Sequence, residues 1–332
     1  MGLSGESFNY VLLRVLCVLR GEHVIIETIN LTKRYGELVA LNNLHLKIEE
    51  GECFGYIGPN GAGKTTTIKI LATLLQPTWG EARVCGYVIG YQSRKIRPLV
   101  GYVPDFFGAY QDMVVSEYLE FFASAYGITG QQRTRIVSDV LSLTDLTYKQ
   151  DALVDSLSRG MKQRLSIARV LLHDPKVLLL DEPASGLDPR ARIEIRELLK
   201  ELHRMGKTIV ISSHILPELA DLCSTVGILE RGELVFHGAV REATRQAKLG
   251  TRVQIRVVEK LELAAQVLGR LEAVKGVQMT DGHLSVELKE DVRDYSFLAR
   301  ALIENRLQIQ EIREEEVNLE TAFLRLTKGI VQ

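Results

Sequence analysis

Several features that would place this chain in a specialised class are scarce in its sequence. It has four cysteines in 332 residues, at positions 17, 53, 85 and 223, and no CxxC pair. This argues against a disulfide framework or a zinc site and fits a reducing compartment. The chain also has no excess of charge of either sign, because 41 basic residues nearly balance 42 acidic ones and leave a net charge of −1. A protein that coats nucleic acid needs a strongly basic surface, so the balance of charge argues against that class.

Long apolar runs are also missing. The stretch Tyr10–Leu19 is interrupted by Arg14 and is shorter than the roughly 20 residues that span a bilayer. It makes a weak signal peptide, because no positive charge precedes it and no small-residue cleavage site follows. We expect residues 1–22 to be a poorly ordered extension, and a membrane-surface or docking helix is the alternative. No other segment reaches spanning length, which predicts a soluble chain.

The remaining composition is that of an ordinary globular protein, 46% apolar and 25% charged, with a length that suggests about two domains. Residues 23–240 alternate apolar β-type runs with helical patterns, which predicts an α/β core with a mixed or parallel sheet. A mostly helical insertion is expected at about 105–173. The expected strands are 24–29, 52–58, 177–183 and 207–214, and the expected helices are 64–74, 115–126, 131–143, 159–172 and 189–205.

The pattern changes in residues 241–332. Strand and helix patterns follow one another there in the order β-α-β-β-α-β, with a last helix at the end, which predicts a small α+β domain of ferredoxin-like type. Basic and acidic side chains are equal in number in this segment. The predicted domain therefore has no electrostatic preference for nucleic acid.

The loop after the strand at 52–58 matches the pattern G-x-x-x-x-G-K-[ST]. It consists of Gly58, Pro59, Asn60, Gly61, Ala62, Gly63, Lys64, Thr65 and Thr66. Glycines let backbone N–H groups converge on phosphate oxygens, and the following helix points the positive end of its dipole at the same place. We expect Lys64 to reach the β- and γ-phosphates of ATP and Thr65 to offer its hydroxyl to Mg²⁺. The plainer alternative is a glycine-rich turn before a helix.

Two carboxylates end the strand at 177–183, where ligands bind in open α/β sheets. Asp181 is expected to hold Mg²⁺, directly or through water. Glu182 is then free to position and deprotonate a water that attacks the γ-phosphate. Adjacent carboxylates also occur in plain strand-to-turn caps, and it is the phosphate loop upstream that favours the catalytic interpretation.

Three further motifs make the pattern specific: Leu-Ser-Arg-Gly-Met-Lys-Gln-Arg at 157–164, Ser-Gly-Leu-Asp at 185–188, and Ser-Ser-His at 212–214. With the two motifs above, they resemble the ATP-binding subunits of ABC transporters over about residues 24–238. The resemblance implies a P-loop NTPase fold of the ABC ATPase type. It also implies a head-to-tail homodimer, in which each ATP is clamped between one subunit's phosphate loop and the other's signature motif.

The signature motif departs from the family pattern L-S-G-G-Q at two positions. Ser158 and Gly160 match, whereas Arg159 and Met161 do not. By resemblance, Ser158 and the backbone at Gly160 would contact the γ-phosphate of the ATP held by the partner, where a helix N-terminus favours negative charge. Arg159 would either add a cation to that site or point into solvent.

The resemblance assigns roles to three more residues. His214 would contact the γ-phosphate and communicate across the dimer, although a histidine after a strand is more often a capping residue. Asp188 would lie in the dimer's nucleotide site, and it also fits a helix N-cap before Pro189. Tyr35 would stack on the adenine ring, and a surface tyrosine beside a strand is the alternative.

One departure concerns the metal. The family usually has a glutamine, which contacts Mg²⁺ and the transporter interface, after the strand that leads into the helical insertion. Here Asp105 occupies that position. Aspartate is also able to ligate Mg²⁺, but it is shorter and charged. The aromatic run at 106–110 would face the membrane partner, or pack the core of the insertion itself.

Taken together, the motifs predict a cytoplasmic ATPase subunit of an ABC exporter, peripheral on the cytoplasmic face of the membrane. ATP and Mg²⁺ are its expected cofactors, and its expected partners are a second ATPase subunit and a separately encoded integral-membrane permease. The C-terminal domain resembles the one appended to ATPases of bacterial type-two exporter systems. The alternatives are a soluble ABC ATPase acting on nucleic acid or ribosomes, and a nucleotide switch with low turnover.

Overall fold

The computed structural model describes residues 24–106, 108, 112–246, 252–280, 282–289, 292, 294–314 and 319–327. The predicted extension at 1–22 lies outside these residues. The described chain forms two compact units, one of which runs to Val240 and also includes Thr327, while the other is Arg241–Leu326. Each unit is described by itself below. No helix in the described part of the chain is both long and apolar enough to cross a membrane.

The first unit contains two sheets. Its six-stranded sheet has the order β10-β9-β3-β8-β7-β6, in which β10 is antiparallel to β9 and the other neighbours run parallel. Its strands are β3 (Cys53–Ile57), β6 (Val100–Val103), β7 (Val177–Asp181), β8 (Thr208–Ser213), β9 (Thr225–Glu230) and β10 (Glu233–Ala239). Every residue of β3, β7 and β8 is buried, as the continuous apolar runs predict for strands covered on both faces.

The second sheet of this unit is antiparallel, with the order β2-β1-β4-β5. Its strands are β1 (Val24–Tyr35), β2 (Leu38–Glu49), β4 (Trp79–Val84) and β5 (Tyr87–Val88). The expected strand 24–29 is therefore the start of a longer strand outside the parallel core. Exposed and buried residues are interspersed along β1 and β2, which is the pattern of a sheet with one covered face.

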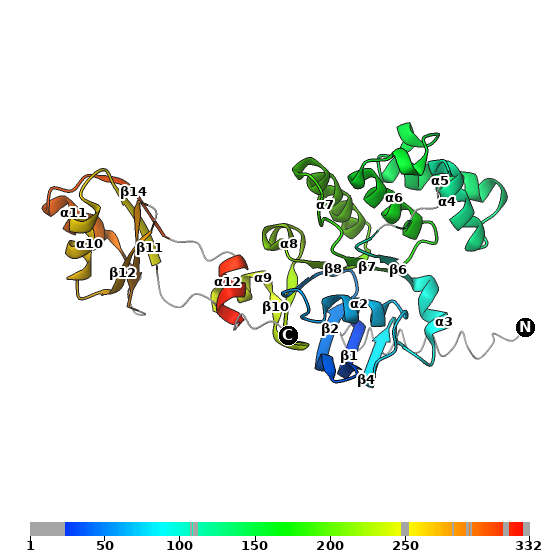
Figure 1. The fold of residues 1–332 in the computed structure, drawn as a ribbon, viewed down its shortest axis with the longest axis horizontal. Helices are drawn as coiled ribbons and strands as arrows, with labels where there is room; N and C mark the ends of the chain where they lie inside the picture. Colours follow the sequence, from blue (N-terminus) through cyan, green and yellow to red (C-terminus); the bar gives the residue numbers. More distant parts are fainter. Residues whose placement is uncertain are drawn as a thin grey trace, which may run out of the picture. The chain divides into compact units, whose positions relative to one another are not determined.

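Helix α2 (Lys64–Leu71) lies between the two sheets (Figure 1). Its buried residues Ile68, Ile70 and Leu71 share one apolar core with residues of β1, β2, β7 and β8. A helix that is covered on two sides has little freedom to move. The end of α2 that carries the phosphate loop is therefore held rigidly between the sheets.

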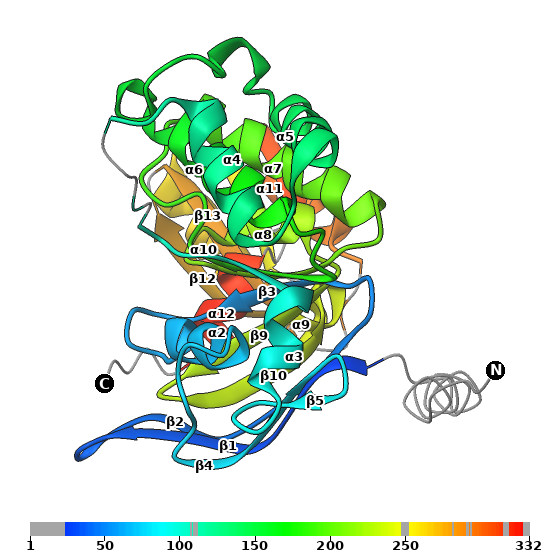
Figure 2. The ribbon, with the colours of Figure 1, turned by 90° about the vertical axis from the view of Figure 1, so that its right-hand side faces the viewer.

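The other helices of the first unit lie mainly on the opposite face of the six-stranded sheet from β1, β2 and β4, as both views show (Figures 1 and 2). Three of them, α4 to α6, come between β6 and β7 in the chain. The helices are α3 (Ser93–Ile96), α4 (Val115–Ala125), α5 (Gly130–Leu143), α6 (Arg159–Leu171), α7 (Pro189–Arg204) and α8 (Leu216–Leu222). Short 3-10 turns occupy Arg97–Leu99, Thr147–Lys149 and Val154–Ser156.

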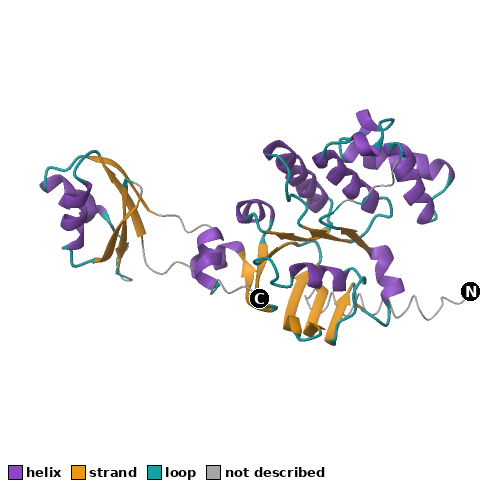
Figure 3. Ribbon diagram, viewed as in Figure 1, coloured by secondary structure: helices purple, strands orange, loops and turns teal. Residues whose placement is uncertain are grey.

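The second unit is built on an antiparallel sheet of order β12-β13-β11-β14, with α10 and α11 on one face (Figure 3). Its elements are α9 (Val240–Gln246), β11 (Arg252–Val257), α10 (Leu261–Gly269), β12 (Val274–Thr280), β13 (His283–Leu288), α11 (Ser296–Glu304), β14 (Ile309–Glu314) and α12 (Leu319–Leu326). Alternate residues of β11 and β13 are fully buried in a core with leucines of α10 and α11. The order β-α-β-β-α-β is the one that the sequence predicts.

Candidate functional site

The phosphate loop connects buried β3 to the start of α2. Gly63 precedes the helix with a φ of 106°, a conformation that side chains other than glycine rarely adopt. A Cβ atom at Gly63 would lie 2.5 Å from the carbonyl oxygen of Ala40, and one at Gly58 would lie 2.5 Å from that of Leu229. The two glycines therefore let the loop pass close to neighbouring backbone.

The loop presents the amino end of α2. The first intrahelical bond runs from Thr67 N–H to the carbonyl of Gly63, so the three preceding amides of the helix have no acceptor within it. No acidic side chain lies in the first turn to compete for this end of the dipole. Such an arrangement binds anions, and above all phosphate groups.

Lys64 brings a positive charge to the same place. Its ammonium donates to the carbonyl oxygens of Gly58 (2.6 Å) and Pro59 (3.1 Å) and lies 3.8 Å from Oε1 of Glu182. Burial lowers the pKa of Lys64, and the negative charges of Glu182 and Asp181 oppose that effect. The ammonium thus lies beside the amino end of α2, among two backbone oxygens and one carboxylate.

Asp181 ends β7 and is almost fully buried. Its Oδ1 accepts hydrogen bonds from the hydroxyl of Thr65 (3.1 Å) and the hydroxyl of Ser212 (2.8 Å). Ser212 is its register partner on the parallel neighbour β8. The first residues of α2 and the ends of β7 and β8 therefore meet at one carboxylate.

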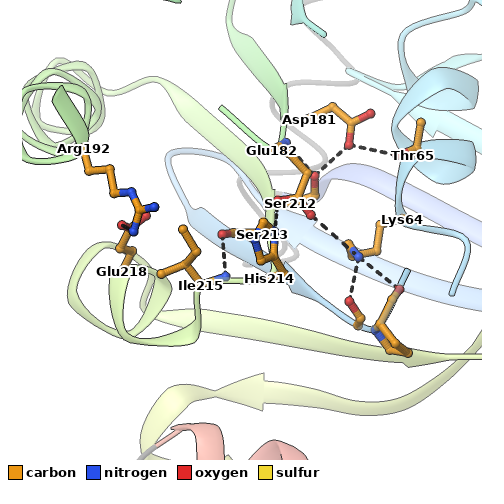
Figure 4. A network of polar contacts seen from close by, with 12 residues as sticks. Lys64, Thr65, Asp181, Glu182, Arg192, Ser212, Ser213, His214, Ile215 and Glu218 are labelled. Carbon is orange, nitrogen blue, oxygen red and sulfur yellow. Dashed lines mark hydrogen bonds and ion pairs between the residues drawn. The ribbon is translucent and has the colours of Figure 1, made fainter. Parts of the chain in front are cut away.

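Glu182 follows directly, with a left-handed φ of 50°. Its N–H donates to the hydroxyl of Ser212 (3.0 Å) and to the carbonyl oxygen of the same residue (3.2 Å). Its Oε2 lies 2.7 Å from Nδ1 of His214, and Figure 4 shows the whole network. Left-handed backbone at a residue other than glycine costs energy and is concentrated at functional sites.

Lys64, Glu182 and His214 border a cavity of about 680 Å³, whereas Asp181 lies behind its wall and, like Gly58 and Pro59, does not line it. The lining residues are Tyr35, Leu38, Ala40, Asn60, Gly61, Ala62, Gly63, Lys64, Thr65, Thr66, Asp105, Glu182, Ser185 and His214. The cavity thus joins residues from β1 and β2, the phosphate loop with the start of α2, and the loops after β6, β7 and β8. Tyr35 lies at the edge of the cavity and is half exposed, and the ammonium of Lys33 is 5.2 Å from the centre of its ring.

The signature residues do not line this cavity. Ser158 caps α6 and accepts a hydrogen bond from Met161 N–H (3.3 Å), and Gly160 packs so closely on α7 that a Cβ there would lie 2.7 Å from Cβ of Ala191. Asp188 caps α7 and accepts from Ala191 N–H (2.9 Å). The guanidinium of Arg159 packs directly against Gly186.

Ser212 was not expected as a site residue, and neither were Leu38, Ala40 and Ser185 in the cavity wall. A signal for Ser212 was present, since its strand and the strand of Asp181 were both expected to be parallel and buried. Polar side chains at the carboxyl ends of such strands converge on one edge of the sheet. For Leu38 and Ala40 no signal was available, because both lie in the antiparallel sheet.

A divalent cation would have few protein ligands here. No group of three or more His, Cys, Asp or Glu side chains within the described ranges has the geometry of a metal site. The hydroxyl of Thr65 and the carboxylate of Asp181 lie together, and both are oxygen donors. Magnesium bound to a nucleotide typically uses one or two protein oxygens together with phosphate oxygens and water, so the residues present fit that ion.

Known proteins resemble the chain in sequence. The family described as "ABC transporter" matches residues 41–185. The Nod factor export ATP-binding protein I of Burkholderia orbicola (strain AU 1054) is 42% identical over 210 residues, which cover 63% of this chain and 69% of that protein. The Linearmycin resistance ATP-binding protein LnrL of Bacillus subtilis (strain 168) is 31% identical over 301 residues, or 90% of this chain and 96% of that protein.

Solved structures agree with these relatives. An ATP-binding subunit of an ABC transporter superposes with a TM-score of 0.62 and 30% identity, covering 68% of this chain and 94% of that one. An ATP-binding cassette solved as a dimer with ADP and phosphate has a TM-score of 0.59 and 29% identity, covering 64% of this chain and 98% of that one. They confirm the predicted fold class. The chain belongs to the family of ABC transporter ATP-binding subunits, which are ATPases.

Proposed function

We propose that this protein is the ATP-binding and ATP-hydrolysing subunit of an ABC exporter. The observation that carries the proposal is that Lys64, Thr65, Glu182 and His214 line one cavity, with Asp181 hydrogen-bonded to Thr65 directly behind its wall. The relatives support the exporter role, since one is named for Nod factor export and the other, for linearmycin resistance, is similar along 90% of this chain. The transported substrate would be selected by the permease.

The phosphates of ATP would bind at the amino end of α2. There the free amides of the first helical turn and the ammonium of Lys64 supply positive charge. To reach a phosphate, the ammonium would exchange its bonds with the carbonyls of Gly58 and Pro59 for a charge-assisted bond. Tyr35, at the edge of the cavity, would stack on the adenine ring, which supplies affinity for any flat base.

Magnesium would be held by Thr65 and Asp181, and Asp105 also lines the cavity. When bound, the ion would neutralise charge on the phosphate oxygens. Glu182 would act as general base and accept a proton from the attacking water. The histidine at 2.7 Å would orient that carboxylate, because an ionised carboxylate accepts a hydrogen bond and Nδ1 of His214 then donates it.

The signature residues would act in a second copy of the chain. Ser158 and Gly160 begin α6 outside the cavity of their own chain, and a solved relative with the same fold is a dimer. A head-to-tail homodimer would bring this helix end to the phosphates of the partner's ATP. Arg159 and Asp188 would lie in the same composite site.

The permease would dock on the helices between β6 and β7. Asp105 and the exposed ring of Phe106 lie where this segment begins, while Phe107, Ala109 and Tyr110 of the expected aromatic run lie outside the described residues. Exposed aromatic rings are typical anchors of protein interfaces. Docking would place the protein on the cytoplasmic face of the membrane.

The proposal is tested by purifying the full chain from membranes and measuring ATPase activity. We expect magnesium-dependent hydrolysis and co-purification with one integral-membrane protein. Hydrolysis without a membrane partner would favour the alternative of a soluble ATPase. Absence of nucleotide binding by the folded chain would refute the proposal altogether.

A further inference from the structure

Ser212 is a polar residue in a fully buried strand of the six-stranded sheet. It lies near the end of β8, every residue of which is buried, and its own exposure is 0%. Its register partners are Asp181 on β7 and Tyr56 on β3. Burial of a hydroxyl costs free energy unless the group is hydrogen-bonded, so the bonds that this serine makes require an explanation.

The hydroxyl of Ser212 connects both carboxylate residues. It donates to Oδ1 of Asp181 over 2.8 Å and accepts from the backbone N–H of Glu182 over 3.0 Å. The buried hydroxyl of Ser212 thus connects the carboxylate of Asp181, which also accepts from Thr65, to the backbone of Glu182, which has a left-handed φ. Figure 4 shows Ser212 between these partners.

We propose that Ser212 is a positioning residue that sets the orientation of the Asp181 carboxylate for magnesium and the position of Glu182 for hydrolysis. Both hydrogen bonds to Asp181 within the described part of the chain use Oδ1. Oδ2 is therefore the oxygen left for the ion or for its water. The inference rests on the proposed function, because it concerns the same nucleotide site.

The consequences of removing the hydroxyl follow from these bonds. Asp181 would keep one donor, Thr65, and its carboxylate would gain rotational freedom. The backbone N–H of Glu182 would keep only its longer bond, to the carbonyl of Ser212 at 3.2 Å. The backbone pairing of β8 would remain, so we expect the fold to survive the substitution while metal binding and hydrolysis weaken.

The adjacent residue Ser213 supplies a matched control. It is also a buried serine of β8, but its hydroxyl accepts from Ile215 N–H (2.9 Å) and bonds to neither carboxylate. Ser213→Ala removes the same chemical group one residue away. A general effect of losing a buried hydroxyl from this strand would therefore appear in both variants.

The experiment measures ATP affinity of the full chain by fluorescence titration, once in EDTA and once with magnesium. For Ser212→Ala we expect the wild-type ATP affinity in EDTA. Adding magnesium should increase the ATP affinity roughly tenfold less than in the wild type, which is the effect of losing one hydrogen bond to a charged acceptor. Ser213→Ala should show the wild-type gain. Should Ser212→Ala fail to fold, Ser212→Cys keeps the size with a weaker donor and should show a reduced gain.

The outcomes separate this inference from the proposed function. A wild-type magnesium gain in Ser212→Ala, or an equal loss in both serine variants, would overturn the positioning role and leave the ATPase assignment intact. If the wild-type chain itself shows no ATP binding or no magnesium gain, the proposed function fails first. A reduced gain in Ser212→Ala alone, with a lower kcat, is the result we expect.

Discussion

Replacing Glu182 by glutamine should stop hydrolysis and preserve ATP binding. The amide has nearly the same shape as the carboxylate but cannot accept the proton of an attacking water. Loss of a general base typically lowers turnover 10²- to 10⁴-fold, or about 3–5 kcal/mol in activation free energy. Binding should survive because the substitution leaves the ammonium of Lys64, 3.8 Å from Oε1, and the amino end of α2 in place to bind the phosphates.

The assay is phosphate release from the full chain in a single turnover, together with nucleotide titration. Glu218→Gln is the matched control, because this glutamate of α8 faces Arg192 at 3.8 Å and does not line the cavity. We expect the control to hydrolyse ATP at the wild-type rate. Undiminished turnover in Glu182→Gln would refute its assignment as general base, and equal losses in both variants would point to a general effect of charge.

Three further results are expected. Lys64→Ala should abolish tight ATP binding in a titration, and wild-type affinity would contradict the phosphate-loop assignment. Tyr35→Ala should weaken ATP binding roughly tenfold through lost stacking, whereas Tyr148→Ala, an exposed tyrosine outside the cavity, should not. Burial lowers the pKa of His173 from 6.5, so the unfolded chain binds its proton more readily and stability should fall as the pH drops below 6.5. Urea unfolding at pH 5.5 and 7.5 should show a smaller pH effect in His173→Gln, and an unchanged effect would exclude this residue as its source.

Contiguous motifs made the phosphate loop and the acidic strand end predictable. Each of these motifs consists of consecutive residues, and each adjoins a buried strand that the sequence shows as an apolar run. Lys64 and Glu182 could be named because a loop of fixed geometry and a strand end determine where such residues point. The structure places both beside the same cavity, with their charged groups 3.8 Å apart.

Contacts between distant strands were much harder to predict. The antiparallel sheet of β1, β2, β4 and β5 was not expected, because a strand pattern does not show which strand it pairs with. The role of Ser212 depends on its register with Asp181, which lies 31 residues earlier. A shift of one residue in that register would turn the hydroxyl to the other face of the sheet. Such a role becomes visible only when the strands are paired.

The role of the signature motif is hard to predict for a different reason, because the motif would act on ATP bound to a second copy of the chain. Ser158 bonds to Met161 N–H and Gly160 packs against Ala191, and these contacts account fully for a helix start without any ligand. Composition, periodicity and the single-chain cavity all agree with that plain interpretation. Only the resemblance to a family whose solved members include a dimer suggests a phosphate there. Arg159, which packs on Gly186, would carry its charge to the same interface, so its effect is measurable only where two chains close around ATP.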